Sequence, residues 1–350
     1  MAPSTPDQIL NTSWTLHRLS PLHHETEFPS LLDNPEALKV YANRLRDQLT
    51  GNVLAGFQVG TSAPSTEEDT LSRTGALKNC TWEAISSLAL ETSNTPHPGN
   101  PCGILVVLEY ENITYKAALL APEGSHSRKT STYLPLLLTR LPGPLRQTFI
   151  SFLSANFDTY CSVFRLPSQF LCAGLASYLD ALTQGRDREW ATSRAILEDV
   201  VKEIQITVSF STNVAPDLRS LNINIPRGSI KSFLPVTGDS NQPSGSILSA
   251  VSSYIEQHLA MDLDLAGSSA KDSPARKHVR ISKIACNGFV LGAEGKMKLV
   301  AQPTRAGSAG DDSAENDDAQ NEKKRLALRA SEVLLLSVIR RSLVGGNQES

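Results

Sequence analysis

Two apolar runs separated by two polar residues constrain the fold more than any other feature of this chain. Residues 104–110 (Ile-Leu-Val-Val-Leu-Glu-Tyr) and 113–120 (Ile-Thr-Tyr-Lys-Ala-Ala-Leu-Leu) flank Glu111 and Asn112, which suit the turn of a β-hairpin. Both arms are almost continuously apolar, so we expect them in the middle of a sheet that is covered on both faces. The hairpin also predicts that neighbouring strands run antiparallel.

The second half of the chain has strands of a different pattern. Residues 204–210 alternate apolar and polar side chains without a break, and residues 221–225 do the same. Such alternation is typical of a strand with one wet face. Further strands are expected at 279–281, 289–291 and 297–300.

Several helices accompany these strands. In the first, Asn34 can cap the N-terminus, Pro35 suits the first helical position, and Gly51 can close the helix before a strand expected at 53–59. Its buried face is predicted from apolar residues at spacings of three and four, namely Leu38, Tyr41, Leu45 and Leu49. Other helices are expected at 167–183, 246–259 and 322–343.

The fold class follows from these elements. We predict an α+β (mixed α/β) protein with a largely antiparallel, curved sheet and packed helices, because hairpins adjoin one another and strand–helix alternation is irregular. Two halves are expected, residues 1–185 and residues 186–350. The second half is predicted to contain a flexible acidic insertion at 302–321, which is poor in apolar residues.

Composition excludes several classes of protein. The net charge is -3, so any nucleic-acid binding must come from a local patch. The chain contains no run of eighteen apolar residues, so no membrane span is expected. Its first twelve residues lack the pattern of a secretory signal, so no such signal is expected either. The five cysteines never form a C-x-x-C pair and are expected to be reduced and mostly buried.

A search for catalytic motifs finds none. The chain has no phosphate-binding loop, no nucleophile elbow and no dinucleotide fingerprint, and His23-His24-Glu25 lacks the second histidine of a zinc protease. We therefore assign no catalytic, cofactor-binding or metal residue, and we expect neither an enzyme nor a small-molecule substrate. Two alternatives stay open: a generic adaptor, and an enzyme whose pocket combines dispersed residues such as Tyr110, Tyr115, Glu256 and His258.

Basic residues gather around the strands near the end of the chain. If they share one face of a sheet, they can contact several phosphates at once, in a salt-sensitive and sequence-independent way. An ordinary solvated face is the alternative. The candidates for DNA contact are Arg276, Lys277, Arg280, Lys283, Lys296 and Lys298.

Three segments of the chain resemble the CENP-L family of inner-kinetochore subunits, particularly its fungal members. These are the run Trp14-Thr15-Leu16-His17-Arg18-Leu19-Ser20-Pro21-Leu22, the passage from Tyr41 to Leu54, and the hairpin from Gly288 to Leu299. The resemblance implies a non-enzymatic scaffold of the constitutive centromere-associated network, located in the nucleus at the centromere and kinetochore. It also implies partners: a CENP-N-like subunit in a heterodimer, other inner-kinetochore proteins, and centromeric DNA or nucleosomes.

The same resemblance suggests roles for individual residues. It implies that the sheet near the end of the chain forms the heterodimer, and that Arg276, Lys277, Arg280 and Lys283 face DNA. A purely internal core role is the alternative for the apolar residues of that sheet. The candidates for the partner interface are Ile281, Ile284, Phe289 and Leu291.

Overall fold

The computed structural model divides into two compact units. Unit 1 comprises Met1–Ala89, Ser93–Phe164 and Val338–Ser350, and unit 2 comprises Leu90–Thr92 and Arg165–Ser337. The structure describes residues 8–24, 27–54, 74–85, 87–88, 101–122, 130–183, 199–213, 217–230, 233, 247–261, 263, 265, 278–300 and 315–344, without the side chains of 52–54 and 315–320. The division between domains predicted at residues 185 and 186 stays a prediction.

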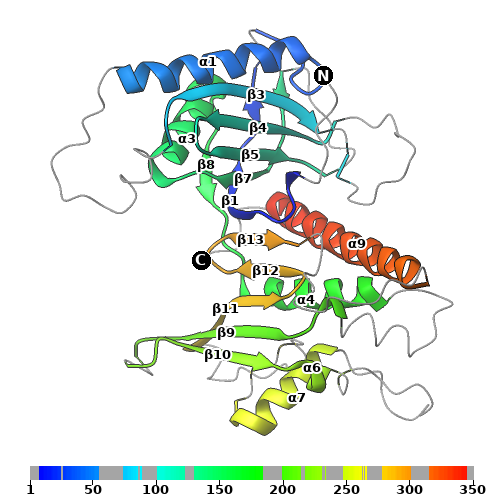
Figure 1. Cartoon of the computed structure of the whole chain (residues 1–350). Helices are drawn as coiled ribbons and strands as arrows, with labels where there is room; N and C mark the ends of the chain where they lie inside the picture. Colours follow the sequence, from blue (N-terminus) through cyan, green and yellow to red (C-terminus); the bar gives the residue numbers. More distant parts are fainter. Residues whose placement is uncertain are drawn as a thin grey trace. The chain divides into compact units, whose positions relative to one another are not determined.

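Unit 1 is built on a six-stranded antiparallel sheet (Figure 1). Its strand order is β8 (Cys161–Val163), β1 (Ser13–Leu19), β7 (Leu136–Arg140), β5 (Thr114–Leu120), β4 (Gly103–Tyr110) and β3 (Leu77–Ile85). A separate two-stranded sheet joins β2 (Leu22–His23) to β6 (Ser131–Thr132). The predicted hairpin is confirmed, since β4 and β5 pair from Gly103 opposite Leu120 to Glu109 opposite Thr114.

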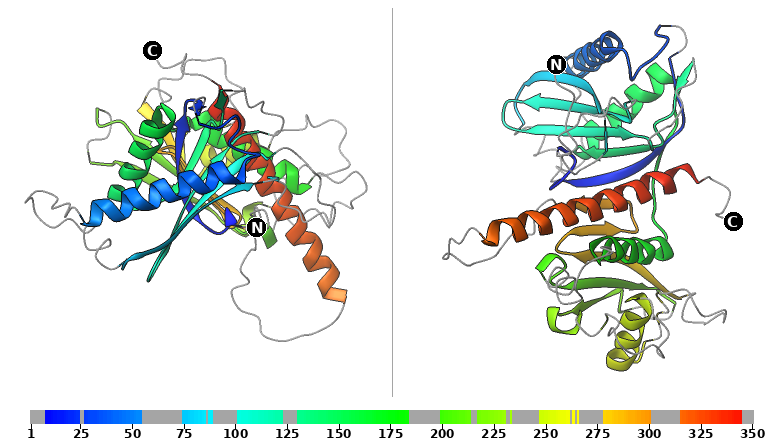
Figure 2. Two further views of the ribbon diagram at one scale, coloured as in Figure 1. Left: turned by 90° about the horizontal axis from the view of Figure 1, so that it is seen from above. Right: turned by 90° about the vertical axis from the view of Figure 1, so that its right-hand side faces the viewer.

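Two helices of unit 1 pack on its sheet, α1 (Pro35–Leu54) and α3 (Gly143–Phe157) (Figure 2). The side chain of Asn34 caps α1 as predicted, because its Oδ1 accepts hydrogen bonds from the backbone N–H groups of Glu36 and Ala37, each at 3.1 Å. Aromatic rings fill the core between helices and sheet, with ring centroids 4.5 Å apart for Tyr41 and Phe157 and 6.3 Å apart for Trp82 and Phe157.

Some boundaries in unit 1 differ from the sequence-based expectation. Helix α1 continues through Gly51 to Leu54, so the strand predicted to begin at residue 53 was wrong at its start, and residues 55–59 lie outside the described part of the chain. Nothing lies within 4 Å of the position where a Cβ of Gly51 would be. A glycine on an exposed helix face costs only about 1 kcal/mol, which is too little to end a helix that is anchored by its other residues.

Unit 2 contains a five-stranded antiparallel sheet and four helices among its described residues. The strand order is β10 (Ser220–Ile225), β9 (Ile204–Phe210), β11 (Val279–Cys286), β12 (Phe289–Gly292) and β13 (Lys296–Leu299). The helices are α4 (Ser168–Thr183), α6 (Arg227–Ile230), α7 (Ile247–Leu259) and most of α9 (Glu315–Leu343). Helix α9 is longer than expected and takes in residues 315–321 of the predicted acidic insertion, whose earlier residues lie outside the description.

Helix α4 packs closely on the sheet of unit 2. A Cβ added to Gly174 would lie 3.1 Å from Leu334 Cδ1 of α9 and 3.2 Å from Leu291 Cδ1 of β12, so the glycine permits a close approach to both. One turn further along α4, the ring centroid of Tyr178 lies 4.8 Å from that of Phe289. The two helices therefore cover the same face of the sheet.

Candidate nucleic-acid interface

The four basic side chains on the strands of unit 2 lie on one face of its sheet. Cross-strand pairing places Arg280 opposite Ser209 and Lys283 opposite Thr207, and these two partners are two residues apart on β9. Because alternate residues of a strand point to the same side, Arg280 and Lys283 share a face. We call this the basic face.

A β-bulge makes this arrangement possible. Arg280 and Lys283 are three residues apart, so a regular strand would direct them to opposite faces. The register shifts between Ile281 and Lys283, which leaves Ser282 as the extra residue of the bulge. The bulge also brings Ile281 and Ile284 together on the other face, so the apolar and basic residues separate cleanly.

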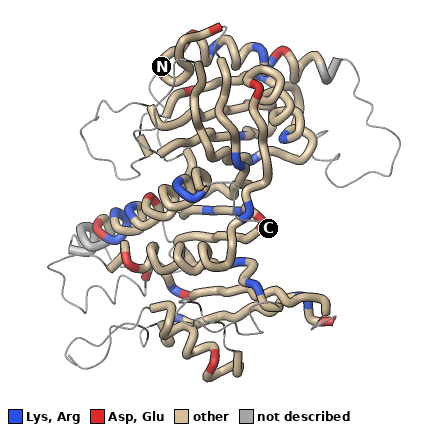
Figure 3. The backbone as a smooth tube through the Cα atoms, turned by 180° about the vertical axis from the view of Figure 1, so that it is seen from behind, with Lys and Arg blue, Asp and Glu red and all other residues tan. Residues whose placement is uncertain are grey.

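The remaining lysines extend the basic face across β12 to β13. Lys283 is opposite Gly292, which in turn is opposite Lys296, so one row across three strands holds two lysines with only a glycine between them. Lys298 is opposite Val290 on the same face. Figure 3 marks the basic positions along these strands in blue.

No carboxylate offsets this charge within the sheet. The five strands of unit 2 contain four Lys and Arg residues and no Asp or Glu. Arg280 and Lys296 are exposed, while Lys283 and Lys298 are half-buried. Lys283 donates a hydrogen bond to Gln205 Oε1 at 3.3 Å, and none of the four cations forms an ion pair with a described residue.

The other two predicted DNA contacts, Arg276 and Lys277, lie outside the described residues. They directly precede His278 and β11, the strand that carries Arg280 and Lys283. Their part in the basic face stays a prediction.

The apolar interface candidates lie on the opposite, covered face of the same sheet. Their exposed fractions are 6% or less, and Leu291 and Phe289 contact α4 in the way described above. Their side chains therefore hold the sheet of unit 2 on its own helices, while their strands belong to the sheet predicted to form the heterodimer. The four are Ile281, Ile284, Phe289 and Leu291.

The residues of the enzyme alternative do not form a catalytic arrangement. Tyr110 and Tyr115 meet as neighbouring rings, with centroids 5.7 Å apart, and burial raises the pKa of Tyr110 to about 12. Glu256 and His258 are exposed on α7, where the His258 ring lies 4.3 Å from that of Tyr254.

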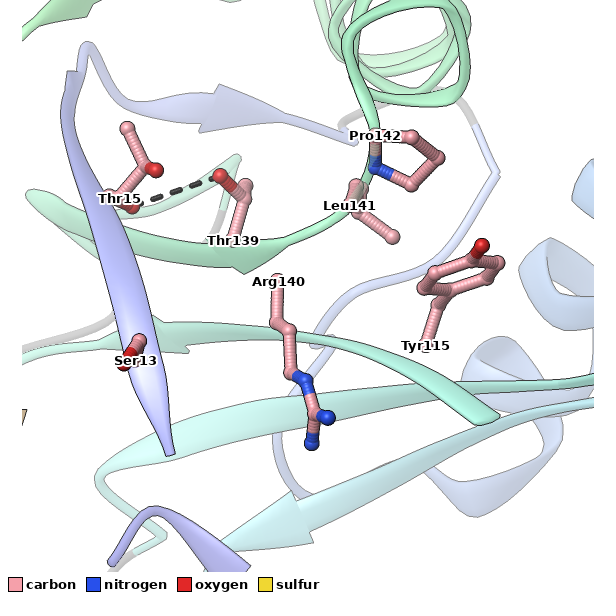
Figure 4. A pocket seen from close by; sticks show the side chains of 7 residues that line it. All are labelled: Ser13, Thr15, Tyr115, Thr139, Arg140, Leu141 and Pro142. Carbon is pink, nitrogen blue, oxygen red and sulfur yellow. Dashed lines mark hydrogen bonds between the residues drawn. The ribbon is translucent and has the colours of Figure 1, made fainter. Parts of the chain in front are cut away.

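Tyr115 does line one shallow hollow in unit 1 (Figure 4). Its wall combines Thr139, whose hydroxyl donates a hydrogen bond to the backbone oxygen of Thr15 at 3.4 Å, with Arg140 and Pro142. Arg140 is exposed, and no carboxylate or histidine lines the hollow. It offers no pair of groups for acid–base or nucleophilic chemistry.

His24 has a structural role in unit 1, and the cysteines are free thiols. Both ring nitrogens of His24 are occupied by hydrogen bonds, Nδ1 with the Phe28 carbonyl at 2.7 Å and Nε2 with the Thr132 hydroxyl at 2.9 Å. All five cysteines are free, and burial raises the pKa of the Cys80 thiol to about 12. No cluster of three metal-ligating side chains occurs among the described residues.

Membrane insertion through a helix finds no support in the described residues. None of their helices combines the length and the apolar character needed to cross a bilayer.

Comparison with known proteins identifies one family. The model of the family described as CENP-L, Centromere protein L, matches residues 8–343, which is nearly the whole chain. No curated protein matches the chain.

Proposed function

Because the chain belongs to the CENP-L family, whose members are structural kinetochore components of the nucleus, we propose that it is a non-enzymatic scaffold that engages centromeric DNA through the basic face. The observation that carries this proposal is that basic and apolar side chains lie on opposite faces of the sheet of unit 2. Four cations lie on one face of this sheet, none of its five strands carries an acidic residue, and its opposite face is packed against helices.

The chemistry of the basic face suits the phosphate backbone of duplex DNA. Neighbouring strands lie about 4.8 Å apart, so the row from Lys283 through Gly292 to Lys296 spans about 10 Å. Lysine and arginine at such spacings contact adjacent phosphates without reading the bases. Aromatic side chains that would stack on single-stranded bases are absent from the basic face of β11, β12 and β13.

The same sheet also supplies a surface for a CENP-N-like partner. Within the described residues β10 pairs on one side only, with β9, so its other edge has free backbone donors and acceptors. Ile281, Ile284, Phe289 and Leu291 are buried on the face of the sheet that α4 covers, so they would stabilise the sheet without contacting the partner themselves. We propose that the partner meets the sheet at the edge strand β10.

DNA contact is tested by reversing charge on the basic face. We expect Arg280→Glu, Lys296→Glu and Lys298→Glu together to abolish binding of the full chain, with its partner, to duplex DNA at low salt, and to leave heterodimer formation intact. The matched control reverses three exposed cations elsewhere: Lys39→Glu, Lys78→Glu and Arg165→Glu. Equal loss in both triple variants would mean that only net charge matters, and would overturn the assignment of the basic face.

The partner is tested by co-purification of the tagged chain from nuclear extract, followed by mass spectrometry. The scaffold proposal expects a CENP-N-like subunit and other centromere proteins in near-equal amounts. Recovery of the chain alone as a stable monomer would contradict it, and recovery of unrelated proteins would favour a generic adaptor.

A further inference from the structure

One serine occupies a special position beside the basic face. Ser220 is the first residue of β10 and lies opposite Ser209, which lies opposite Arg280 on the next strand. These three residues form a single row across β10, β9 and β11, on the same face as the lysines. Ser220 is exposed and its row lies on the basic face, so a modifying enzyme can reach it from that face even when a partner occupies the edge of β10.

The other hydroxyl groups of this face are engaged or half-buried. Thr207 donates a hydrogen bond to Asn222 Oδ1 at 2.7 Å, and Ser282 donates one to the Thr207 carbonyl at 3.1 Å. Ser209 is half-buried between two flanking strands. Ser220 is exposed, and its side chain forms no hydrogen bond with a described residue.

The row also brings Ser220 within reach of a cation. Two strand spacings separate the Cα atoms of Ser220 and Arg280 by about 10 Å, and only the small side chain of Ser209 stands between them. A phosphate on Ser220 and the Arg280 guanidinium can meet above Ser209. Arginine pairs with phosphate through two parallel hydrogen bonds, which makes such a pair specific.

We propose that Ser220 is a phosphorylation site that switches off the basic face. A protein kinase would supply the group from ATP: the Ser220 oxygen bonds to the γ-phosphorus, the bond from that phosphorus to the β-phosphate oxygen breaks, ADP leaves, and the hydroxyl proton passes to a base of the kinase. The phosphoserine pairs with Arg280 and adds about −1.5 to −2 charge to a face that holds four cations. This inference rests on the proposed function of the basic face.

The ion pair is tested without DNA. The full chain is prepared with phosphoserine incorporated at position 220, and its phosphorus resonance is followed against pH. A free phosphoserine has a second pKa of about 6, and pairing with Arg280 lowers it because the cation favours the dianion. The shift should disappear in the Arg280→Gln variant, and an unshifted pKa in the wild-type background would overturn the proposed pair.

The switch is tested by duplex-DNA binding of the same proteins. We expect phosphoserine at 220 to weaken binding about tenfold and to reduce its salt dependence, since one phosphate contact is lost. The control carries phosphoserine at position 151, an exposed site on α3 of unit 1, and should bind like the unmodified chain. Equal weakening by phosphoserine at 220 and at 151 would mean that only the net charge matters, and would overturn the proposed switch.

The two tests separate the inference from the function on which it rests. If the phosphorus titration shows the ion pair between phosphoserine 220 and Arg280 but the unmodified protein does not bind DNA, the proposed function is wrong. The proposed switch is then wrong as well, while the ion pair itself is supported. If DNA binds through Arg280 but phosphorylation leaves it unchanged, the switch alone fails. Mass spectrometry of protein from dividing cells should find phosphate on the peptide containing Ser220, and recovery of that peptide only in unmodified form would overturn the site.

Discussion

The sheet of unit 1 buries large apolar side chains on both of its faces, whereas the sheet of unit 2 buries them on one. On β4 the consecutive residues Ile104, Leu105 and Val106 are all 1% exposed or less, although neighbours along a strand point to opposite sides. On β9 the buried residues Ile206 and Val208 alternate with partly exposed Thr207. The sheet of unit 1 therefore forms a core on both sides, whereas the described residues of unit 2 leave one face of its sheet uncovered.

This difference shows how one chain can combine a stable framework with a binding surface. A sheet that is covered on both faces gains stability from twice the apolar area, but it has no face to offer a partner. A sheet with one open face gives up part of that gain. In this protein the open face of unit 2 is also where the basic residues gather.

The largest effects are expected from truncations on both faces of unit 1. Ile104→Ala and Leu105→Ala remove neighbouring side chains that are 0% and 1% exposed and point to opposite faces, so each should cost about 2–5 kcal/mol of stability. Urea unfolding followed by tryptophan fluorescence measures the loss, because Trp14 and Trp82 are both buried in unit 1. A cost below about 1 kcal/mol for either variant would mean that its face is not covered in solution.

In unit 2 the same experiment should give unequal results. Leu291→Ala removes a fully buried side chain against α4 and should cost about 2–5 kcal/mol, whereas Val290→Ala removes a half-buried one on the basic face and should cost less than about 1 kcal/mol. Hydrogen exchange of the β12 amides measures the stability of this unit. Equal costs would show that the basic face is covered by something in the free protein.

The periodicity of apolar residues predicted the main strands of both units, but it did not predict two strands of the six-stranded sheet of unit 1. The continuous apolar runs of β4 and β5 correctly predicted strands that are covered on both faces. The alternating patterns of β9 and β10 correctly predicted strands with one covered face and one face exposed to solvent. Strand β3 was missed because Lys78, Asn79 and Glu83 interrupt its apolar pattern, although the strand is well paired with β4. Strand β7 was missed because its five residues are followed closely by Pro142, which suggests only a break.

The basic face depends on a feature that a sequence pattern does not reveal. Arg280 and Lys283 share a face only because Ser282 forms a bulge, and a bulge has no reliable signature in a run such as Val-Arg-Ile-Ser-Lys-Ile. The sequence predicted which residues would gather, under the condition that they shared a face. The cross-strand register fulfils that condition for Arg280, Lys283, Lys296 and Lys298.

A smaller effect is expected from the titration of His17, a residue of unit 1. His17 lies on its sheet with 4% exposure, and burial, with a further contribution from Arg146, lowers its pKa to about 4. The unfolded chain takes up this proton near pH 6.5 while the folded chain does not, so the His17 contribution is complete above pH 6.5 and is lost as the pH falls towards 4. We expect a loss of about 2 kcal/mol over this window, measured by urea unfolding at several pH values, and a smaller loss in His17→Gln. An identical pH profile for both proteins would remove His17 as the cause.

The smallest effects are expected from neutralising single cations. The salt dependence of DNA binding in such variants gives the number of phosphates that each unit contacts. Since each neutralised phosphate contributes about 0.9 to the slope of log K against log salt, Arg280→Gln should lower that slope by about 1 and weaken duplex-DNA binding severalfold. Lys39→Gln, which removes an exposed cation from α1 of unit 1, should leave the slope unchanged. Adding Arg276→Gln and Lys277→Gln to Arg280→Gln then asks whether the basic face extends before β11: a further fall of about 2 would include both residues. If the slope of the triple variant equals that of Arg280→Gln, the DNA contact is confined to the strands. If Lys39→Gln lowers the slope as much as Arg280→Gln does, unit 1 binds DNA as well, and the two units do not divide into a framework and a binding surface.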